Sequence, residues 1–124
     1  MTFTEAKPEM NLIDTEMLGG LQGILGDDIF GITQLYADQV LSDVTSIIEC
    51  HAAGDASRLK KLAHALKGGS ANMGALEMAR LAGSIEKGAG AGDLNAVSSD
   101  VEALAGVAEQ TLAAMREAKF LKTA

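Results

Sequence analysis

Residues 63–75 read AHALKGGSANMGA and combine an amphipathic helical pattern with one outward-facing histidine. If each residue advances by about 100° from Leu59, the apolar positions of this segment gather within about 60° of that residue. These positions are Leu62, Ala63, Leu66, Ser70 and Met73. His64 falls about 140° from Leu59, clear of the apolar stripe. The pattern therefore predicts a helix that packs by one face and displays an imidazole on another.

Lysines and glycines accompany this histidine. Lys60 and Lys67 fall at about 100° and 80° from Leu59, beside His64, so that they form a local positive cluster with Lys61. Gly68 lies one turn after His64 on the same face. Two adjacent glycines cost a helix about 1 kcal/mol each relative to alanine. We interpret Gly68 as a residue that leaves room for a partner's backbone because it has no side chain. On geometry alone, the alternative is a solvated histidine beside the end of a helix.

The same segment resembles the signature of histidine-containing phosphotransfer (HPt) domains, which reads His-x-Leu-Lys-Gly-x-Ser-x-x-x-Gly-Ala in many members. Residues 64–75 match every defining position of that signature. The resemblance covers about residues 14–120, nearly the whole chain. It implies an HPt domain over residues 12–124, preceded by a loose tail over residues 1–11.

The resemblance also implies roles for individual residues. His64 is the expected phosphoacceptor, and Gly68 is expected to leave room for the backbone of the partner. Lys67, one turn after the histidine, is placed to offset phosphoryl charge as a point cation; an ordinary solvated lysine is the alternative. Family members often carry a Gln or Glu on the following helix that orients the histidine ring. Counting along the segment puts Glu86 there, with a plain surface residue as the alternative.

By this resemblance, His64 accepts a phosphoryl group from a receiver-domain aspartate or a kinase and passes it to another response-regulator receiver. The implied partners are response-regulator receiver domains or a hybrid histidine kinase. The receiver supplies Mg²⁺, and this chain needs no cofactor of its own. The sequence shows neither the ATP-binding glycines nor the metal-holding acidic motifs of a kinase. We therefore expect a phosphocarrier and not an enzyme.

Two other functions stay open at this point. The first is a helical-bundle interaction module that never carries phosphate. The second is the phosphoacceptor domain of a chemotaxis-type histidine kinase. Both keep the same bundle, so the sequence pattern that predicts the fold does not separate them from a phosphorelay carrier.

Composition narrows the class of protein further. The 124 residues are enough for one domain with its own core, and aromatic residues make up only 3% of them, so the core must be aliphatic. The net charge of −7 argues against nucleic acid as a partner. No apolar run is long enough to span a bilayer, and no signal pattern is present. The single cysteine, Cys50, agrees with a reducing compartment, so we expect a cytoplasmic protein. We also expect it to be a monomer.

Other chemistries lack their required residues. Cys50 and His51 are adjacent and lack the spacing of a metal site. The glycines of residues 88–92 follow a helix and carry no Lys-Ser/Thr, so they do not form a phosphate-binding loop. Ser70 lies about 120° around the helix from His64, too far to form a catalytic hydrogen bond with it.

Helix-capping residues and glycines divide the chain into helices. Asp14 can cap a short helix that ends near residue 25, and Asp55 can cap the helix that bears His64, which Gly74 closes. The other expected helices are 28–53, 76–87 and 93–119, with residues 88–92 as a flexible connector. The 28–53 helix carries apolar residues at spacings of three, four or one, namely Ile29, Ile32, Tyr36, Val40, Val44, Ile47 and Ile48. The sequence thus predicts an all-α antiparallel up-and-down four-helix bundle with a short additional N-terminal helix.

Overall fold

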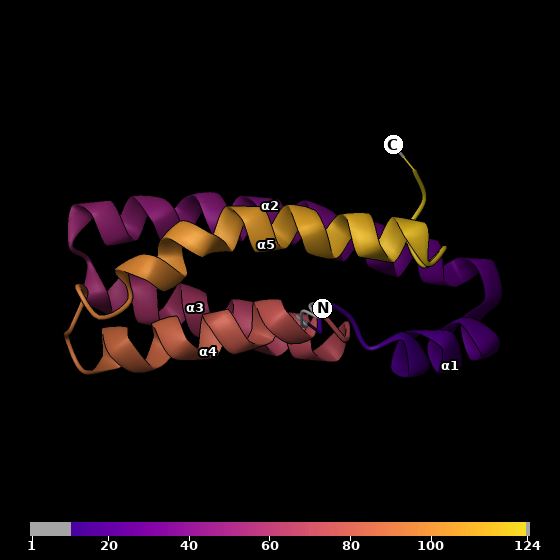
Figure 1. Cartoon of the computed structure of the whole chain (residues 1–124), viewed down its shortest axis with the longest axis horizontal. Helices are drawn as coiled ribbons and strands as arrows, with labels where there is room; N and C mark the ends of the chain where they lie inside the picture. Colours follow the sequence, from indigo (N-terminus) through magenta and orange to yellow (C-terminus); the bar gives the residue numbers. More distant parts are fainter. Residues whose placement is uncertain (1–10, 124) are drawn as a thin grey trace, which may run out of the picture.

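The computed structural model describes residues 11–123, which form helices and no strand (Figure 1). The helices are α1 (Thr15–Leu25), the 3₁₀ turn η1 (Gly26–Asp28), α2 (Ile29–Ala53), α3 (Ala56–Asn72), α4 (Leu76–Gly90) and α5 (Ser98–Glu117). In Figure 1, α2 and α5 form one layer, α3 and α4 form the other, and α1 extends from one end. This arrangement confirms the predicted bundle with its additional helix. The expected tail lies outside the described residues, apart from Asn11.

The predicted caps form at the start of the bundle. The Asp14 carboxylate accepts a hydrogen bond from the Met17 amide at 3.0 Å, and α1 begins at the next residue after Asp14. The Asp55 carboxylate accepts from the Arg58 amide at 3.1 Å, which fixes the start of α3. Gly54 ends α2 in the left-handed conformation, with a φ of 74°. Local sequence therefore sets these boundaries.

The prediction of a flexible connector at residues 88–92 was wrong at its first three positions. α4 continues to Gly90, because Gly88 packs directly against Val97, whose Cγ1 atom leaves no room for a Cβ at position 88. Asp93 does not begin the last helix. Its carboxylate accepts from the Ala96 amide at 3.1 Å and closes a turn, so that α5 begins at Ser98. The helix ends at Glu117 and not at residue 119.

Two of the apolar residues at helical spacing on α2 are exposed. Ile32 and Ile48 keep 42% and 41% of their surface in solvent. They lie on opposite flanks of the buried face, which includes Tyr36, Val40 and Ile47. Only one side of α2 meets its neighbours in the bundle, and a stripe of isoleucines cannot show where that side ends.

The later residues of the 64–75 segment have structural roles. Ser70 is fully buried, and its hydroxyl lies 2.8 Å from the Tyr36 hydroxyl, which joins α3 to α2 inside the core. Gly74 adopts a φ of 66°, and its carbonyl accepts from the Asp14 amide at 2.8 Å. The Leu76 amide donates to the Leu12 carbonyl at 3.0 Å. Residues 74–76 thus anchor residues 12–14, which lead into α1.

Tyr36 offers a spectroscopic test of this core, because the chain has one tyrosine and no tryptophan. Burial raises the pKa of Tyr36 from 10.0 to about 12, although the hydrogen bond with Ser70 acts in the opposite direction. The neutral phenol is the form that suits the core, so the stability it contributes is complete below pH 10 and is lost as pH rises from 10 toward 12. A tyrosinate absorbance titration should show a midpoint near the upper value; ionisation at the ordinary value would contradict the packing.

The Tyr36–Ser70 pair can also be tested by substitution. Tyr36→Phe leaves the Ser70 hydroxyl buried without its partner, which should cost about 1–3 kcal/mol of unfolding free energy. Combining Tyr36→Phe with Ser70→Ala removes both polar groups and should cost less than the sum of the two single changes. Urea unfolding measures each value, and strict additivity would argue against the contact.

Candidate functional site

His64 lies in the middle of α3 and points outward, as the periodicity predicts. Its side chain is 70% exposed, whereas Ala63 and Leu66 on the same helix are buried in the core. The ring therefore stands on a rigid helix whose opposite face is fixed by packing. A docking protein can reach it without any rearrangement of the bundle.

Glu86 of α4 connects the histidine with the lysine one turn further along α3. The His64 Nδ1 atom lies 2.7 Å from Glu86 Oε2, and the Lys67 Nζ atom lies 2.7 Å from Glu86 Oε1. An ionised carboxylate only accepts hydrogen bonds, so Nδ1 carries the proton and donates it. The neutral ring is thereby held in the tautomer whose Nε2 atom keeps its lone pair.

The interactions of Glu86 with Lys67 and His64 keep its carboxyl group ionised. The hydrogen bond from Lys67, followed by the one from His64, holds the pKa of the Glu86 carboxyl below its usual value of 4.5. The carboxylate therefore remains a charged acceptor throughout the neutral pH range. Lys67 is half-exposed and paired with this carboxylate, a contact that the sequence did not indicate.

Two further lysines surround the histidine. Lys60, Lys61 and Ser57 line a shallow depression of about 510 Å³ together with His64 and Glu86. Both lysines are exposed, and neither forms an ion pair with a carboxylate of the described residues. The depression therefore combines a nucleophilic ring with positive charge, which suits an incoming anion.

The glycines of α3 are not required by packing within the chain. Apart from the neighbouring backbone of α3 itself, no atom of the described residues lies within 4 Å of the place where a Cβ would stand on Gly68 or Gly69. The helix runs through both residues to Asn72, so they do not mark a helix end. The open surface over Gly68, beside His64, agrees with the interpretation that this glycine leaves room for the backbone of a partner.

A glycine of α4 also shapes the site, and sequence reasoning missed it. A Cβ on Gly83 would stand 3.3 Å from the Lys67 Cδ atom, so the lysine stem lies directly over this glycine. The stem of Lys60 crosses Gly90 in the same way, at 3.5 Å. Gly83 and Gly90 are seven residues apart, a spacing that places both on one face of a helix. The connector predicted at residues 88–92 hides this relation, because it includes Gly90. Gly83 thus lets Lys67 reach Glu86.

Among residues 11–123, those outside this cluster do not form a second reactive centre of the kinds considered above. Cys50 is buried in the core, and the His51 Nε2 atom lies 3.0 Å from the Leu94 carbonyl, to which it donates. Within residues 11–123, no three His, Cys, Asp or Glu side chains gather as a ligand set for a metal ion. In the same part of the chain, no helix is both long and apolar enough to cross a bilayer.

Comparisons with known proteins agree with this geometry. The family model for the Hpt domain matches residues 31–118. The crystal structure of histidine-containing phosphotransfer protein B (HptB) from Pseudomonas aeruginosa PAO1 is similar over 88% of this chain and 95% of that chain, with a TM-score of 0.81 and 25% identity. A comparison with curated proteins gives no match.

The Glu86 contact predicts the tautomer of His64. In the intact protein the neutral ring should be protonated at Nδ1, and Glu86→Ala should lower that population because the acceptor is gone. Nitrogen NMR of the ring measures the two tautomers directly. Glu77→Ala is the matched control, since Glu77 is a similarly shielded carboxylate of α4 whose ion-pair partner among residues 11–123 is Arg80. An unchanged tautomer in Glu86→Ala would remove Glu86 from the site.

Proposed function

The chain belongs to the Hpt domain family, and we propose that it carries a phosphoryl group on His64 within a phosphorelay. In this proposal His64 accepts the group from a receiver-domain aspartate or a kinase and passes it to a second response-regulator receiver. The observation that carries the proposal is the ring itself, which is 70% exposed and hydrogen-bonded through Nδ1 alone among the described residues. Its other nitrogen is available for attack.

The chemical step requires little of this chain. The Nε2 lone pair attacks the phosphorus of the aspartyl phosphate, the bond from phosphorus to the aspartyl oxygen breaks, and its electron pair leaves with the carboxylate. The phosphorylated ring gains positive charge, which the Nδ1–H bond to Glu86 stabilises. Lys60 and Lys61 line the depression that the phosphoryl oxygens enter. Positioning and charge dominate phosphoryl transfer, so this small set of residues suffices.

The donor groups around His64 do not suit a resident Mg²⁺ ion. Mg²⁺ binds through carboxylates, waters and phosphate oxygens. Here the single carboxylate of the depression, Glu86, is occupied by two cationic or hydrogen-bonding partners, and Lys60 and Lys61 add positive charge. This charge pattern supports the proposal that the partner receiver brings the metal and the acidic site.

An apolar surface beside α3 supports docking of a receiver. Tyr36 meets Ser70, so this part of α2 lies alongside the second half of α3. Leu35 and Ile32 are 69% and 42% exposed there, and Ile24 of α1 is 82% exposed. Exposed apolar side chains that gather on one surface offer a contact area for a partner protein. We infer that a receiver docks across α1, α2 and α3 with its aspartate over His64.

Substitution of the histidine tests the proposal. His64→Gln should abolish labelling by phosphorylated receivers while leaving helical content and unfolding unchanged, because the side chain is exposed. His51→Gln is the matched control, since His51 is the other histidine of the chain. The adduct should be acid-labile and base-stable. Labelling of His64→Gln, or an acid-stable adduct, would overturn the assignment, and a protein that no receiver labels would favour a pure interaction module.

Gly68 can be tested through opposite effects on stability and transfer. Gly68→Ala should stabilise α3 by up to about 1 kcal/mol, since alanine favours the helix and no neighbour obstructs its Cβ. It should also slow transfer from a receiver, because the methyl group occupies space on the docking face. Gly106→Ala in α5 is the control with equally open surroundings. Equal transfer rates in both variants would show that Gly68 provides no clearance.

A further inference from the structure

The two layers of the bundle carry opposite charge. α3 and α4 bear six basic side chains, Arg58, Lys60, Lys61, Lys67, Arg80 and Lys87, against the two acidic ones of Glu77 and Glu86. α2 and α5 bear seven acidic side chains, Asp38, Asp43, Glu49, Asp100, Glu102, Glu109 and Glu117, against the single basic one of Arg116. The acidic layer thus contains most of the net charge and lies opposite the layer that carries His64.

An apolar strip runs along the acidic layer. Starting from Tyr36, which faces α3, a turn of about 120–140° past the core reaches Phe30, Leu41 and Ile48 on the far flank of α2. This turn leads toward α5, because His51, about 60° from Tyr36 in the same direction, lies 3.3 Å from the Ser98 hydroxyl of α5. We call these three residues, together with the exposed Ala105 of α5, the α2–α5 strip.

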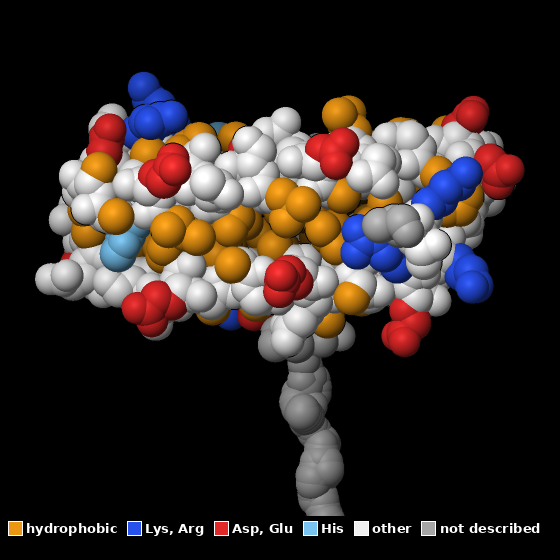
Figure 2. Space-filling model, turned by 90° about the horizontal axis from the view of Figure 1, so that it is seen from above, with side chains coloured by type: hydrophobic (Ala, Val, Ile, Leu, Met, Phe, Trp, Pro, Cys, Tyr) orange, Lys and Arg blue, Asp and Glu red, His pale blue; other side chains and the backbone are white. Residues whose placement is uncertain are grey.

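The α2–α5 strip is open and bordered by acids. Leu41 and Ile48 are 50% and 41% exposed, although each lies on a helix whose other face is buried. Figure 2 shows hydrophobic side chains in a continuous band along the middle of this face, with acidic side chains on both sides. The exposed carboxylates that flank it include Asp38 and Glu49 on α2 and Glu102 and Glu109 on α5.

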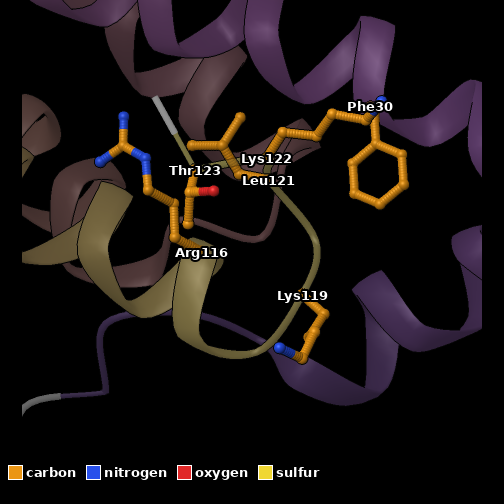
Figure 3. Close-up of a pocket in the computed structure, with 6 residues that line it drawn as sticks. All are labelled: Phe30, Arg116, Lys119, Leu121, Lys122 and Thr123. Atoms are coloured by element: carbon orange, nitrogen blue, oxygen red, sulfur yellow. The ribbon is translucent and has the colours of Figure 1, made fainter.

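The strip ends in a basic pocket beyond the last turn of α5. Phe30, Arg116, Lys119 and Lys122 are among the residues that line it, and the Lys122 Nζ atom lies 5.3 Å from the centre of the Phe30 ring. Figure 3 shows Lys122 extended toward Phe30 while Arg116 points to the other side. The cations do not converge on one point, so they mark the end of the strip and do not form a site for a small anion.

From these observations we propose that the α2–α5 strip binds a basic amphipathic helix of a partner protein. From Phe30 to Ile48 the strip is about 27 Å long, the length of about 18 helical residues. The apolar side chains offer a surface for the hydrophobic face of such a helix, and the carboxylates on either side attract lysine or arginine at its flanks. On α2 the strip lies about 120–140° from Tyr36 in one direction, whereas Ile32 and Leu35 of the receiver surface lie in the other direction, so the helix and a receiver contact different faces of α2.

The charges argue against a symmetric pairing of two copies through this strip. An isologous contact places the same surface on both partners. It would bring the carboxylates of Asp38, Glu49, Glu102 and Glu109 against the same groups of the second copy. Like charges in close contact oppose association, whereas a basic helix neutralises them.

A designed peptide of about 18 residues tests the proposal, with leucine along one face and lysine on both flanks. The full chain should bind it, and amide shift changes should concentrate on the outer faces of α2 and α5. Leu41→Gln combined with Ile48→Gln should weaken binding about tenfold, because the apolar contact is lost without a change of charge. Leu76→Gln is the matched control, since Leu76 is 40% exposed on α4.

Further experiments distinguish binding at the α2–α5 strip from general electrostatic attraction of a basic peptide to an acidic protein. A scrambled peptide of the same composition has no apolar face and should bind at least about tenfold more weakly. Equal binding of both peptides, or shifts spread over the whole surface, would overturn the proposal. So would self-association of the free chain that Leu41→Gln and Ile48→Gln abolish, because a second copy would then occupy the strip. Binding should persist in His64→Gln, so this result is independent of phosphotransfer.

Discussion

The carboxylate of Glu86 accepts one hydrogen bond from His64 and one from Lys67, and these contacts join α4 to α3 at the exposed ring. The lysine keeps the carboxylate charged and in place, and the carboxylate holds the ring nitrogen that faces the protein. The other nitrogen is left toward solvent. A reactive tautomer is therefore set by a neighbouring helix, without burial of the ring and without a dedicated base.

Several packing contacts keep α3 and α4 in the positions that the contacts of Glu86 with His64 and Lys67 require. Gly83 leaves room for the stem of Lys67 to cross α4, and the buried Ser70–Tyr36 contact fixes α3 against α2. Gly74, in the left-handed conformation, turns the chain between α3 and α4 and holds the segment before α1. The motif thus mixes exposed residues with buried residues that build the scaffold.

The sequence predicted the parts of the fold that depend on local interactions. The caps at Asp14 and Asp55 and the glycine at position 54 act on their own neighbours, so the first three helices were predicted nearly to the residue. The end of α4 depends on the contact between Gly88 and Val97, which are far enough apart that no local pattern reveals it. The exposure of Ile32 and Ile48 was hidden for a similar reason, since it depends on where neighbouring helices stop.

The site was predictable in its residues but not in its connections. Periodicity placed His64 outward, and the family resemblance selected Glu86 across a 22-residue separation. Neither indicated that Lys67 pairs with that same carboxylate, because long flexible side chains can choose among several partners. The segregation of charge between the two layers was visible only once the bundle showed which helices share a face.

The position of the phosphoryl group on the ring is the most direct test of this account. Phosphorus–nitrogen couplings in the phosphorylated, nitrogen-labelled protein identify the bonded ring atom. The Glu86 contact predicts a bond at Nε2, with Nδ1 still protonated and donating to the carboxylate. A phosphoryl group on Nδ1 would contradict the account, because that atom would then have to leave Glu86 before it could react.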